Sequence, residues 1–145
     1  RGCCLQVSCH THSIRIHQHI HKSGQMASQL LAAVEGGGTS FVVTIALLRP
    51  SELRGTTVKH TSFEILHQET IPSVIPSDTL CKVCEFFKKH APEGGYDALG
   101  IACFGPLGVN EEDPSTYGKI LPGSPKKDWR NVDILSPILD ACTSL

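Results

Sequence analysis

Residues 30–48 read LLAAVEGGGTSFVVTIALL, two apolar runs separated by three glycines and a threonine. The first run, residues 30–34, predicts a buried strand, and the second, residues 40–48, predicts its return partner. Glycine has no Cβ, so the residues between the runs let the backbone turn sharply and let a ligand approach it closely. The segment therefore predicts two paired strands with a glycine turn at one end.

The glycine turn suits two roles. A row of N–H groups from Gly36, Gly37 and Gly38, followed by the hydroxyl of Thr39, suits phosphate oxygens. Glu35, at the end of the first strand, suits a hydrated metal ion. An ordinary glycine hairpin would use the same residues, and the segment by itself leaves both interpretations open.

Length and charge narrow the classes of function. A chain of 145 residues could form one domain with a hydrophobic core, and its net charge of −1 argues against nucleic acid as a partner. Residues 1–25 contain three basic and no acidic residues, so the rest of the chain carries a net charge of −4. Backbone groups and a metal ion, rather than a basic patch, are therefore expected to hold any phosphate ligand. No apolar stretch approaches the ~20 residues of a membrane span, so we expect no membrane partner.

The seven cysteines are odd in number and follow no regular spacing. Buried, reduced thiols in a cytoplasmic protein are the simplest interpretation. Cys81 and Cys84 have the spacing of a redox or metal pair. Both are predicted to lie near the apolar stripe of one helix, and the sequence has no second pair of this kind, which favours core packing.

Residues 1–25 differ in composition from the rest of the chain. They lack helical or strand periodicity and have too little apolar content for a core, so we predict an unstructured head. The head holds most of the histidines and several cysteines: His10, His12, His17, His19, His21, Cys3, Cys4 and Cys9. Zinc or copper binding and organelle targeting are two interpretations. We favour a third interpretation, in which the protein starts at Met26 and an incomplete gene model has added the upstream sequence. The spacing of the histidines and cysteines matches no standard zinc pattern.

After Met26 the apolar pattern predicts a mixed α/β sheet. The expected elements are strands at residues 30–34, 40–48 and 61–70, a helix at 79–90, a buried strand at 97–104, a short extended piece at 119–121 and a last helix at 132–142. The prolines of residues 49–52 and 71–76 predict a turn and a connection, and Ser77-Asp78 predicts the cap of the first helix. The order is a three-stranded antiparallel meander followed by a helix, a buried central strand, a long loop and a final helix.

A second glycine-containing turn, residues 104–108, follows the buried strand. Ligands of α/β sheets collect at the carboxyl ends of central strands, where both glycine turns are predicted to lie, and this coincidence favours a site at residues 35–39. The long loop beyond carries tyrosine, lysine and tryptophan at residues 117–119 and 124–129, which could cover a sugar by stacking and hydrogen bonding. A surface loop pinned by one buried tryptophan, Trp129, fits the same residues.

Four segments resemble those of a known family. They are VEGGGTSFV at residues 34–42, GIACFGP at 100–106, YGKI at 117–120 and SPKKDW at 124–129. In this order, over about residues 30–140, they are similar to the amino-terminal part of fructokinases of the ROK family (repressors, open reading frames and kinases). The resemblance implies an actin-like ATPase fold whose first domain has ribonuclease-H-like topology. Residues 26–145 would then be an incomplete amino-terminal lobe of a sugar kinase.

The resemblance also implies a reaction, the transfer of the γ-phosphoryl group of ATP to the 6-hydroxyl of fructose with magnesium. In that family the acid-glycine-threonine loop holds the nucleotide phosphates, and this role passes to Glu35, Gly36, Gly37, Gly38 and Thr39, with Glu35 reaching magnesium through water. Segments near the sugar in that family imply substrate-binding roles for Gly105, Pro106, Tyr117, Gly118 and Lys126. The expected partners are thus a sugar and ATP, and the parent protein could be a homodimer.

The chain departs from the family pattern at several points. Ser40 stands where the family usually has lysine, and Asp128 stands where it has glycine. The family's catalytic aspartate, in a Thr-Asp-Val-Asn type segment, and its zinc-binding His/Cys cluster are expected beyond Leu145. Because phosphoryl transfer needs both substrates positioned between two lobes, we expect a fragment with little or no activity. Two alternatives stay open: a kinase for another hexose (glucose, mannose or an N-acetyl amino sugar), and a non-catalytic sugar- or nucleotide-binding module.

Overall fold

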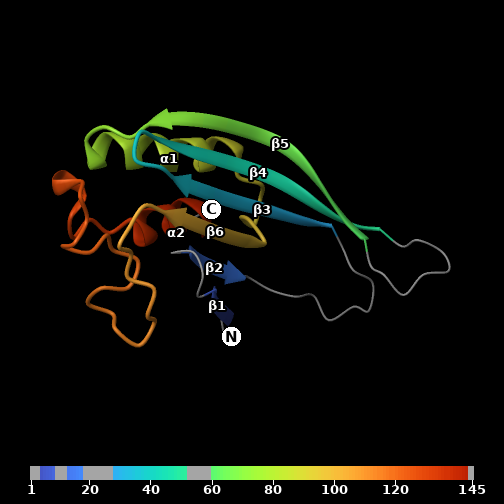
Figure 1. Cartoon of the computed structure of the whole chain (residues 1–145). Coiled ribbons are helices and arrows are strands. Elements are labelled where there is room, and N and C mark those ends of the chain that lie inside the picture. The colour runs from blue at the N-terminus through green and yellow to red at the C-terminus, as the bar shows by residue number, and fades with distance from the viewer. Residues whose placement is uncertain (1–3, 9–12, 18–27, 52–59, 144–145) are drawn as a thin grey trace.

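The computed structural model describes residues 4–8, 13–17, 28–51 and 60–143. Its strands are β1 (Cys4–Ser8), β2 (Ser13–His17), β3 (Gln29–Gly36), β4 (Ser40–Ser51), β5 (His60–Pro72) and β6 (Ala98–Cys103). They form a six-stranded sheet in the order β1-β2-β6-β3-β4-β5 (Figure 1). The helices of the described residues are α1 (Pro76–His90), the short 3₁₀ helix η1 (Lys127–Trp129) and α2 (Leu135–Thr143). The expected mixed α/β architecture is confirmed.

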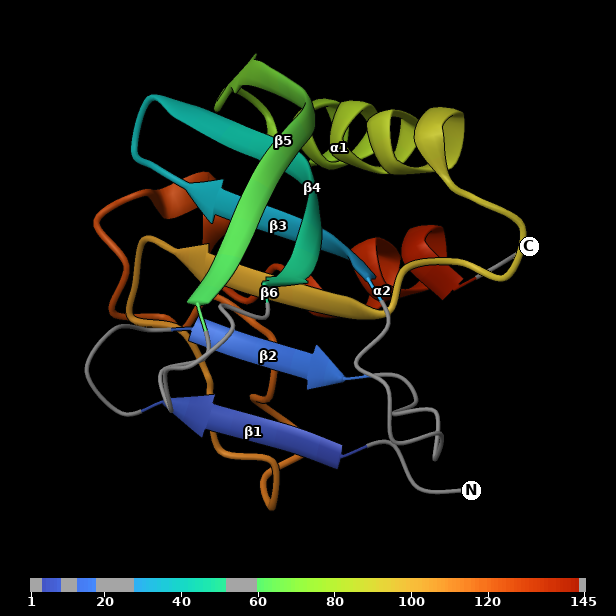
Figure 2. The ribbon, with the colours of Figure 1, turned by 90° about the vertical axis from the view of Figure 1, so that its right-hand side faces the viewer.

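The sheet is antiparallel except at its centre. β3, β4 and β5 form the predicted meander, and β6 lies on the other side of β3 and runs parallel to it. The chain passes from β5 to β6 through α1. The helices α1 and α2 contact each other and lie on the same side of the sheet (Figure 2). In the described part of the chain, no helix covers the opposite face.

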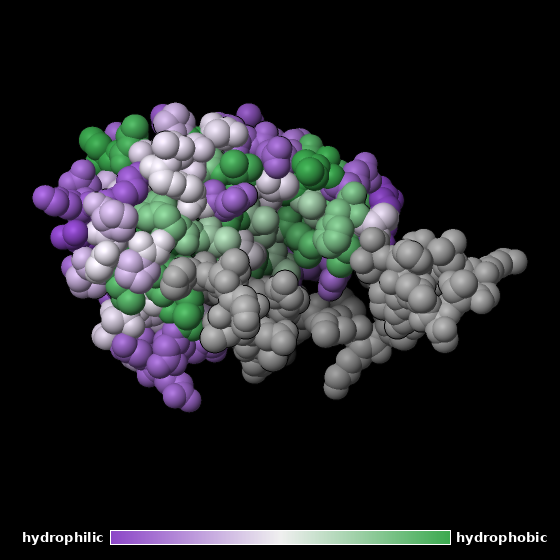
Figure 3. All heavy atoms as spheres, viewed as in Figure 1, coloured by the Kyte–Doolittle hydropathy of each residue, from purple (hydrophilic) through white to green (hydrophobic). Residues whose placement is uncertain are grey.

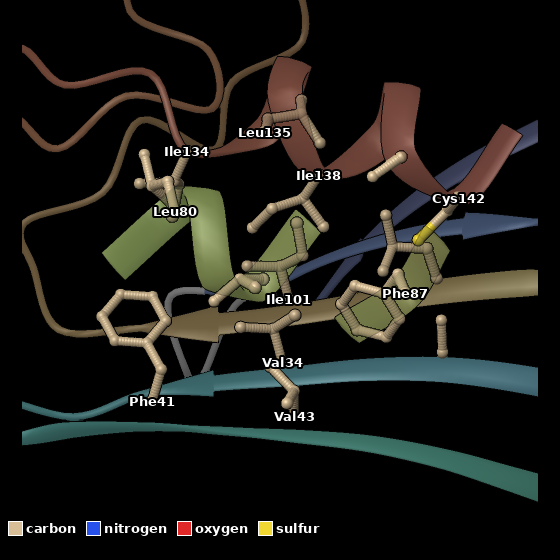
Figure 4. Packing of buried hydrophobic residues seen from close by; sticks show 14 of the residues in the cluster. Val34, Phe41, Val43, Leu80, Phe87, Ile101, Ile134, Leu135, Ile138 and Cys142 are labelled. Atoms are coloured by element: carbon tan, nitrogen blue, oxygen red, sulfur yellow. The ribbon is translucent and has the colours of Figure 1, made fainter. Parts of the chain in front are cut away.

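Strand alternation places the hydrophobic core between the sheet and these two helices. Alternate residues of the central strands are buried: Ala32, Val34, Phe41, Val43, Ile45, Leu99 and Ile101. They pack against apolar side chains of the helices, including Leu80, Val83, Phe87, Leu135 and Ile138 (Figure 4). A one-residue slip would turn this set toward solvent, so burial specifies the register.

The helix-free face is less polar than an open sheet face usually is. By the register of β4 with its neighbours, Ala46 lies between Leu31 of β3 and Ile65 of β5. Ile65 remains 61% exposed and Phe63, two residues earlier on β5, 65% exposed. Figure 3 views this face, and apolar residues run across its middle between polar margins.

Two predicted boundaries in the meander are wrong. β4 continues to Ser51, so the turn expected at residues 49–52 is largely strand. Among the described residues, β4 pairs only with β5 beyond Leu48, and a strand with one neighbour tolerates Pro50, which has no N–H to donate. β5 likewise runs to Pro72, which shortens the connection expected at residues 71–76.

α1 starts earlier than the sequence indicated. It begins at Pro76, whose ring presets a helical φ and whose missing N–H leaves nothing unsatisfied in the first turn. Ser77 and Asp78 lie inside that turn instead of capping it. The buried hydroxyl of Thr79 holds the entry to the helix, because it accepts the Val74 N–H (3.2 Å) and donates to the Pro72 carbonyl (3.2 Å).

α2 begins at Leu135, three residues after the predicted start. The Asp133 carboxylate accepts the Ser136 N–H (2.9 Å) and its hydroxyl (2.7 Å), which satisfies groups of the first turn. Residues 119–120 form bridges to Leu107 and Asp133, in agreement with the predicted extended piece.

The segment predicted to be an unstructured head differs from that prediction at ten residues. β1 and β2 pair with each other, and β2 pairs with β6, which would otherwise present an unpaired edge of a central strand. Cys3, Cys9 and those histidines of residues 1–25 other than His17 lie outside the described residues. The division of the chain at residue 26 stays a prediction.

The four cysteines of residues 28–143 are free thiols. Cys84 is half-buried and its thiol donates to the Pro137 carbonyl (3.3 Å), as expected of a packing residue, whereas Cys81 is exposed. No helix among the described residues has the length and apolar content needed to cross a membrane.

Candidate functional site

The structure brings the two predicted glycine turns side by side. β3 and β6 run parallel with Gly36 opposite Cys103, so the two strands end together. The amide of Phe104 donates to the carbonyl of Gly36 (2.7 Å), which joins the first residues of both turns. The prediction that both lie at the carboxyl ends of central strands is confirmed, and the structure adds that these strands are neighbours.

Gly36 and Gly37 build the turn itself. A Cβ on Gly36 would lie 2.6 Å from Cys103 Sγ and 2.9 Å from Phe41 Cζ, so tight packing requires glycine at this position. The Gly37 N–H donates to the Ser40 carbonyl (2.7 Å) and closes the hairpin. The expected row of N–H groups is therefore shorter than predicted, since that of Gly37 is already used.

The tip of the turn is open. Gly38, Thr39 and Glu35 are exposed, and no atom lies within 4 Å of the position that a Cβ on Gly38 would take. Within the described residues, the amides of Gly38 and Thr39 donate to no other group. Two N–H groups and the Thr39 hydroxyl can thus donate to an anion, so the hairpin is compatible with a binding turn.

Lys126 reaches this turn from 88 residues away in the sequence. Its ammonium donates to the Gly38 carbonyl (2.7 Å), the Ser73 hydroxyl (2.6 Å) and the Ser73 carbonyl (3.2 Å). It also lies over the rings of Phe104 and Trp129, 5.1 and 5.4 Å from their centroids. The sequence placed Lys126 near the sugar, whereas the structure places its charged group at the glycine turn.

Ser73 is a site residue that the sequence analysis missed. Its amide donates to the Thr39 carbonyl (2.8 Å), and its side chain meets Lys126. A single serine in a proline-containing connection carries no sequence signal of such a role. Only the fold brings together the β3–β4 turn, the β5–α1 connection and the loop before η1.

Trp129 anchors this loop. Its buried ring stacks on Phe41 (5.2 Å between centroids) and meets Phe104 edge-on (5.4 Å). Its indole N–H donates to the Val74 carbonyl (3.1 Å), next to Ser73. The interpretation of a loop pinned by one buried tryptophan is confirmed, and it also explains how Lys126 is carried to the glycine turn.

The second turn holds its predicted residues beside the first. Gly105 and Pro106 are half-buried and joined by a cis peptide bond. The Pro106 carbonyl accepts the Leu121 N–H (2.8 Å), which ties this turn to the long loop. Both residues therefore lie where a molecule bound at the glycine turn could extend.

Of the predicted sugar residues Tyr117 and Gly118, the second is held by residues at the start of α2. Gly118 is buried with a φ of 74°, and its carbonyl accepts the amides of Ile134 (3.0 Å) and Leu135 (3.3 Å). A Cβ there would overlap Leu135. Gly118 thus has a packing role, and a contact with sugar stays a prediction for both residues.

The site offers neither a reactive thiol nor a cluster of metal-binding side chains among the described residues. Burial raises the pKa of the Cys103 thiol to about 12, against smaller lowering effects of the Phe104 amide and Lys126, so Cys103 stays neutral and is no nucleophile. Among the described residues, no group of three or more His, Cys, Asp or Glu side chains could hold a metal ion. Glu35 fits magnesium only as a single carboxylate acting with water and phosphate oxygens.

A separate groove of about 350 Å³ lies between β5 and α1. It is lined by Glu69, Thr70, Ile71, Pro72, Lys82, Glu85, Phe86 and Lys89. None of the predicted site residues lines it.

The chain matches three curated proteins named fructokinase. It is 33% identical to that of Zymomonas mobilis over 115 residues, which are 78% of this chain and 33% of that protein. The fructokinase of Streptococcus mutans is 32% identical over 111 residues (77% and 32%), and that of Pediococcus pentosaceus is 34% identical over 106 residues (73% and 30%). No family model and no solved structure matches the chain.

The chain spans about a third of the length of the curated relatives it matches. All three relatives carry the same name, and each is 32–34% identical in sequence to this chain. Over about three quarters of its length this chain is similar to fructokinases.

Proposed function

We propose that this chain provides the phosphate-binding turn of an ATP-dependent kinase that phosphorylates fructose at its 6-hydroxyl. One observation carries the proposal: the exposed glycine turn and the second turn at residues 104–108 meet at the carboxyl ends of two parallel strands. Ligands of α/β sheets bind at such ends. The region of similarity to fructokinases gives the reaction class.

In this proposal the residues of the glycine turn have different roles in binding phosphate. The amides of Gly38 and Thr39 and the Thr39 hydroxyl donate to phosphate oxygens, while Gly36 and Gly37 keep the turn tight. Glu35 holds magnesium through water, and magnesium supplies charge neutralisation on the phosphate chain. The sugar lies beside the second turn, with Gly105 and Pro106 against it and the segment of Tyr117 and Gly118 toward it.

The proposal extends to the superfamily, the cellular location and the oligomeric state of the parent protein. The order β3-β4-β5-α1-β6-α2, with β6 parallel to β3, supports a ribonuclease-H-like domain of the actin-like ATPase superfamily and membership of the ROK family. The free thiols support a reducing, cytoplasmic location. The parent protein is proposed to be a homodimer whose ligands are a sugar and ATP with magnesium.

Isothermal titration calorimetry of this chain with MgATP tests the phosphate role. Thr39→Ala removes one hydroxyl donor and should weaken MgATP binding about three- to tenfold. Thr143→Ala, which removes the hydroxyl of an exposed threonine at the end of α2, is the matched control and should bind as the wild type does. A wild-type chain that binds no MgATP, or equal affinity in both variants, would refute the proposal. Repeating the titration with fructose, glucose, mannose and N-acetylglucosamine present tests the sugar.

A further inference from the structure

Resting on the proposed function, we propose that Lys126 and Ser73 are positioning residues of the phosphate turn, which act on the anion through the Gly38–Thr39 peptide. Lys126 would then contact neither phosphate nor sugar. The ammonium of Lys126 and the amide of Ser73 hold the carbonyls of Gly38 and Thr39 from the protein side (2.7 and 2.8 Å).

The geometry of one peptide unit carries the first step. In a trans peptide the C=O and the following N–H point in opposite directions. The carbonyl of Gly38 points at Lys126, so the amide of Thr39 points away from it, toward the open side of the turn. An anion bound by that amide is therefore separated from the ammonium by the width of the peptide.

Electrostatics gives the second step. A cation at the carbonyl end of a peptide polarises it and strengthens its N–H as a donor, as in cooperative hydrogen-bond chains. Lys126 is half-buried over two aromatic rings, where the interaction is screened less than in open water. The lysine thus improves the anion site without occupying it.

Ser73 gives the third step. Its hydroxyl and carbonyl take two hydrogen bonds of the ammonium, and Gly38 takes the third, so all three N–H groups of Lys126 are used. The serine therefore fixes the direction of the lysine. If Lys126 instead bound phosphate directly, Ser73 would compete with the ligand for the ammonium.

Positioning and direct phosphate binding by Lys126 predict opposite changes in affinity when Ser73 is replaced. The experiment is a titration of the full chain with MgATP and, separately, with inorganic tripolyphosphate. Under our proposal Ser73→Ala weakens the binding of both about threefold, and Ser73→Thr, which keeps the hydroxyl, restores it. Lys126→Met keeps the contact with the rings but loses the charge, and it should weaken binding about tenfold. Lys127→Met is the matched control, because it removes the same charge from an exposed neighbour and should leave binding unchanged.

Tighter or unchanged binding in Ser73→Ala, or equal binding in Lys126→Met and Lys127→Met, would overturn the positioning role while leaving the proposed function intact. A wild-type chain that binds neither probe would refute the proposed function. The positioning of the turn is then judged by amide hydrogen exchange without ligand. There Lys126→Met should speed exchange in residues 36–40 at least threefold relative to Lys127→Met, and equal rates would overturn it.

Discussion

At the scale of single residues, the three glycines of the turn have different tasks. Gly36 is needed for packing against Cys103 and Phe41, Gly37 closes the hairpin, and Gly38 lies open to solvent. The glycine run alone left a hairpin and a site both open, and its place beside a second glycine turn at a strand end favoured the site. It could not show which glycine packs and which stays open, because that depends on neighbours from β4 and β6.

Gly36→Ala should therefore lower the free energy of unfolding, by roughly 1–3 kcal/mol, because its methyl group overlaps Cys103 Sγ. Gly38→Ala is the control, since nothing lies near the added methyl group. Urea denaturation of both variants checks this difference. Equal losses of stability would mean that the turn packs differently.

The buried thiols predict a loss of stability in alkali. Burial raises the pKa of Cys103 and of Cys142 to about 12, above the value of 9.0 for an unperturbed thiol. The unfolded chain thus releases these protons first, so the stabilisation is complete below pH 9 and is lost as the pH rises toward 12. On going from pH 8 to pH 10, the titration of each thiol should lower the free energy of unfolding by roughly 1 kcal/mol. Urea denaturation of wild type and Cys103→Ala at both pH values measures the difference, and identical pH dependence would contradict it.

At the scale of elements, the sequence predicted the central strands well and their ends less well. Long apolar runs at residues 30–34, 40–48 and 97–104 indicate buried strands whatever their partners are. The ends depend on neighbours: Pro50 stays in β4 because β5 is its one partner strand in the described part of the chain. The alternation of Ile14 and Ile16 in β2 is too short to stand out among polar residues, so this strand was missed.

The start of α1 gives a prediction that separates the sequence expectation from the structure. Thr79→Val keeps the shape of the side chain but leaves the Val74 amide and the Pro72 carbonyl without their hydroxyl partner, so stability should fall by about 1–3 kcal/mol. Ser77→Ala, at the cap expected from sequence, should cost less than about 0.5 kcal/mol, because Ser77 is exposed and makes no capping bond. Thermal unfolding of the two variants measures this. A larger loss in Ser77→Ala would restore the predicted cap.

At the scale of the whole molecule, chain segments distant in sequence make the candidate site. The sequence identified the turn at residues 35–39 and the loop with Trp129 separately. The contacts of Lys126 with Gly38 and Ser73 span 88 and 53 residues and could not be read from local patterns. The fold supplies what was missing, because the parallel pairing of β3 and β6 brings both turns to one end of the sheet.

The most direct test of this account is an NMR titration of the ¹⁵N-labelled chain with MgATP, which shows where on the molecule the nucleotide binds. We expect the largest shifts at the amides of Gly38 and Thr39, with smaller shifts at Gly105 and at the indole N–H of Trp129. Shifts confined to the groove between β5 and α1, or no shifts at the glycine turn at saturating MgATP, would contradict the central claim that this turn holds nucleotide phosphates.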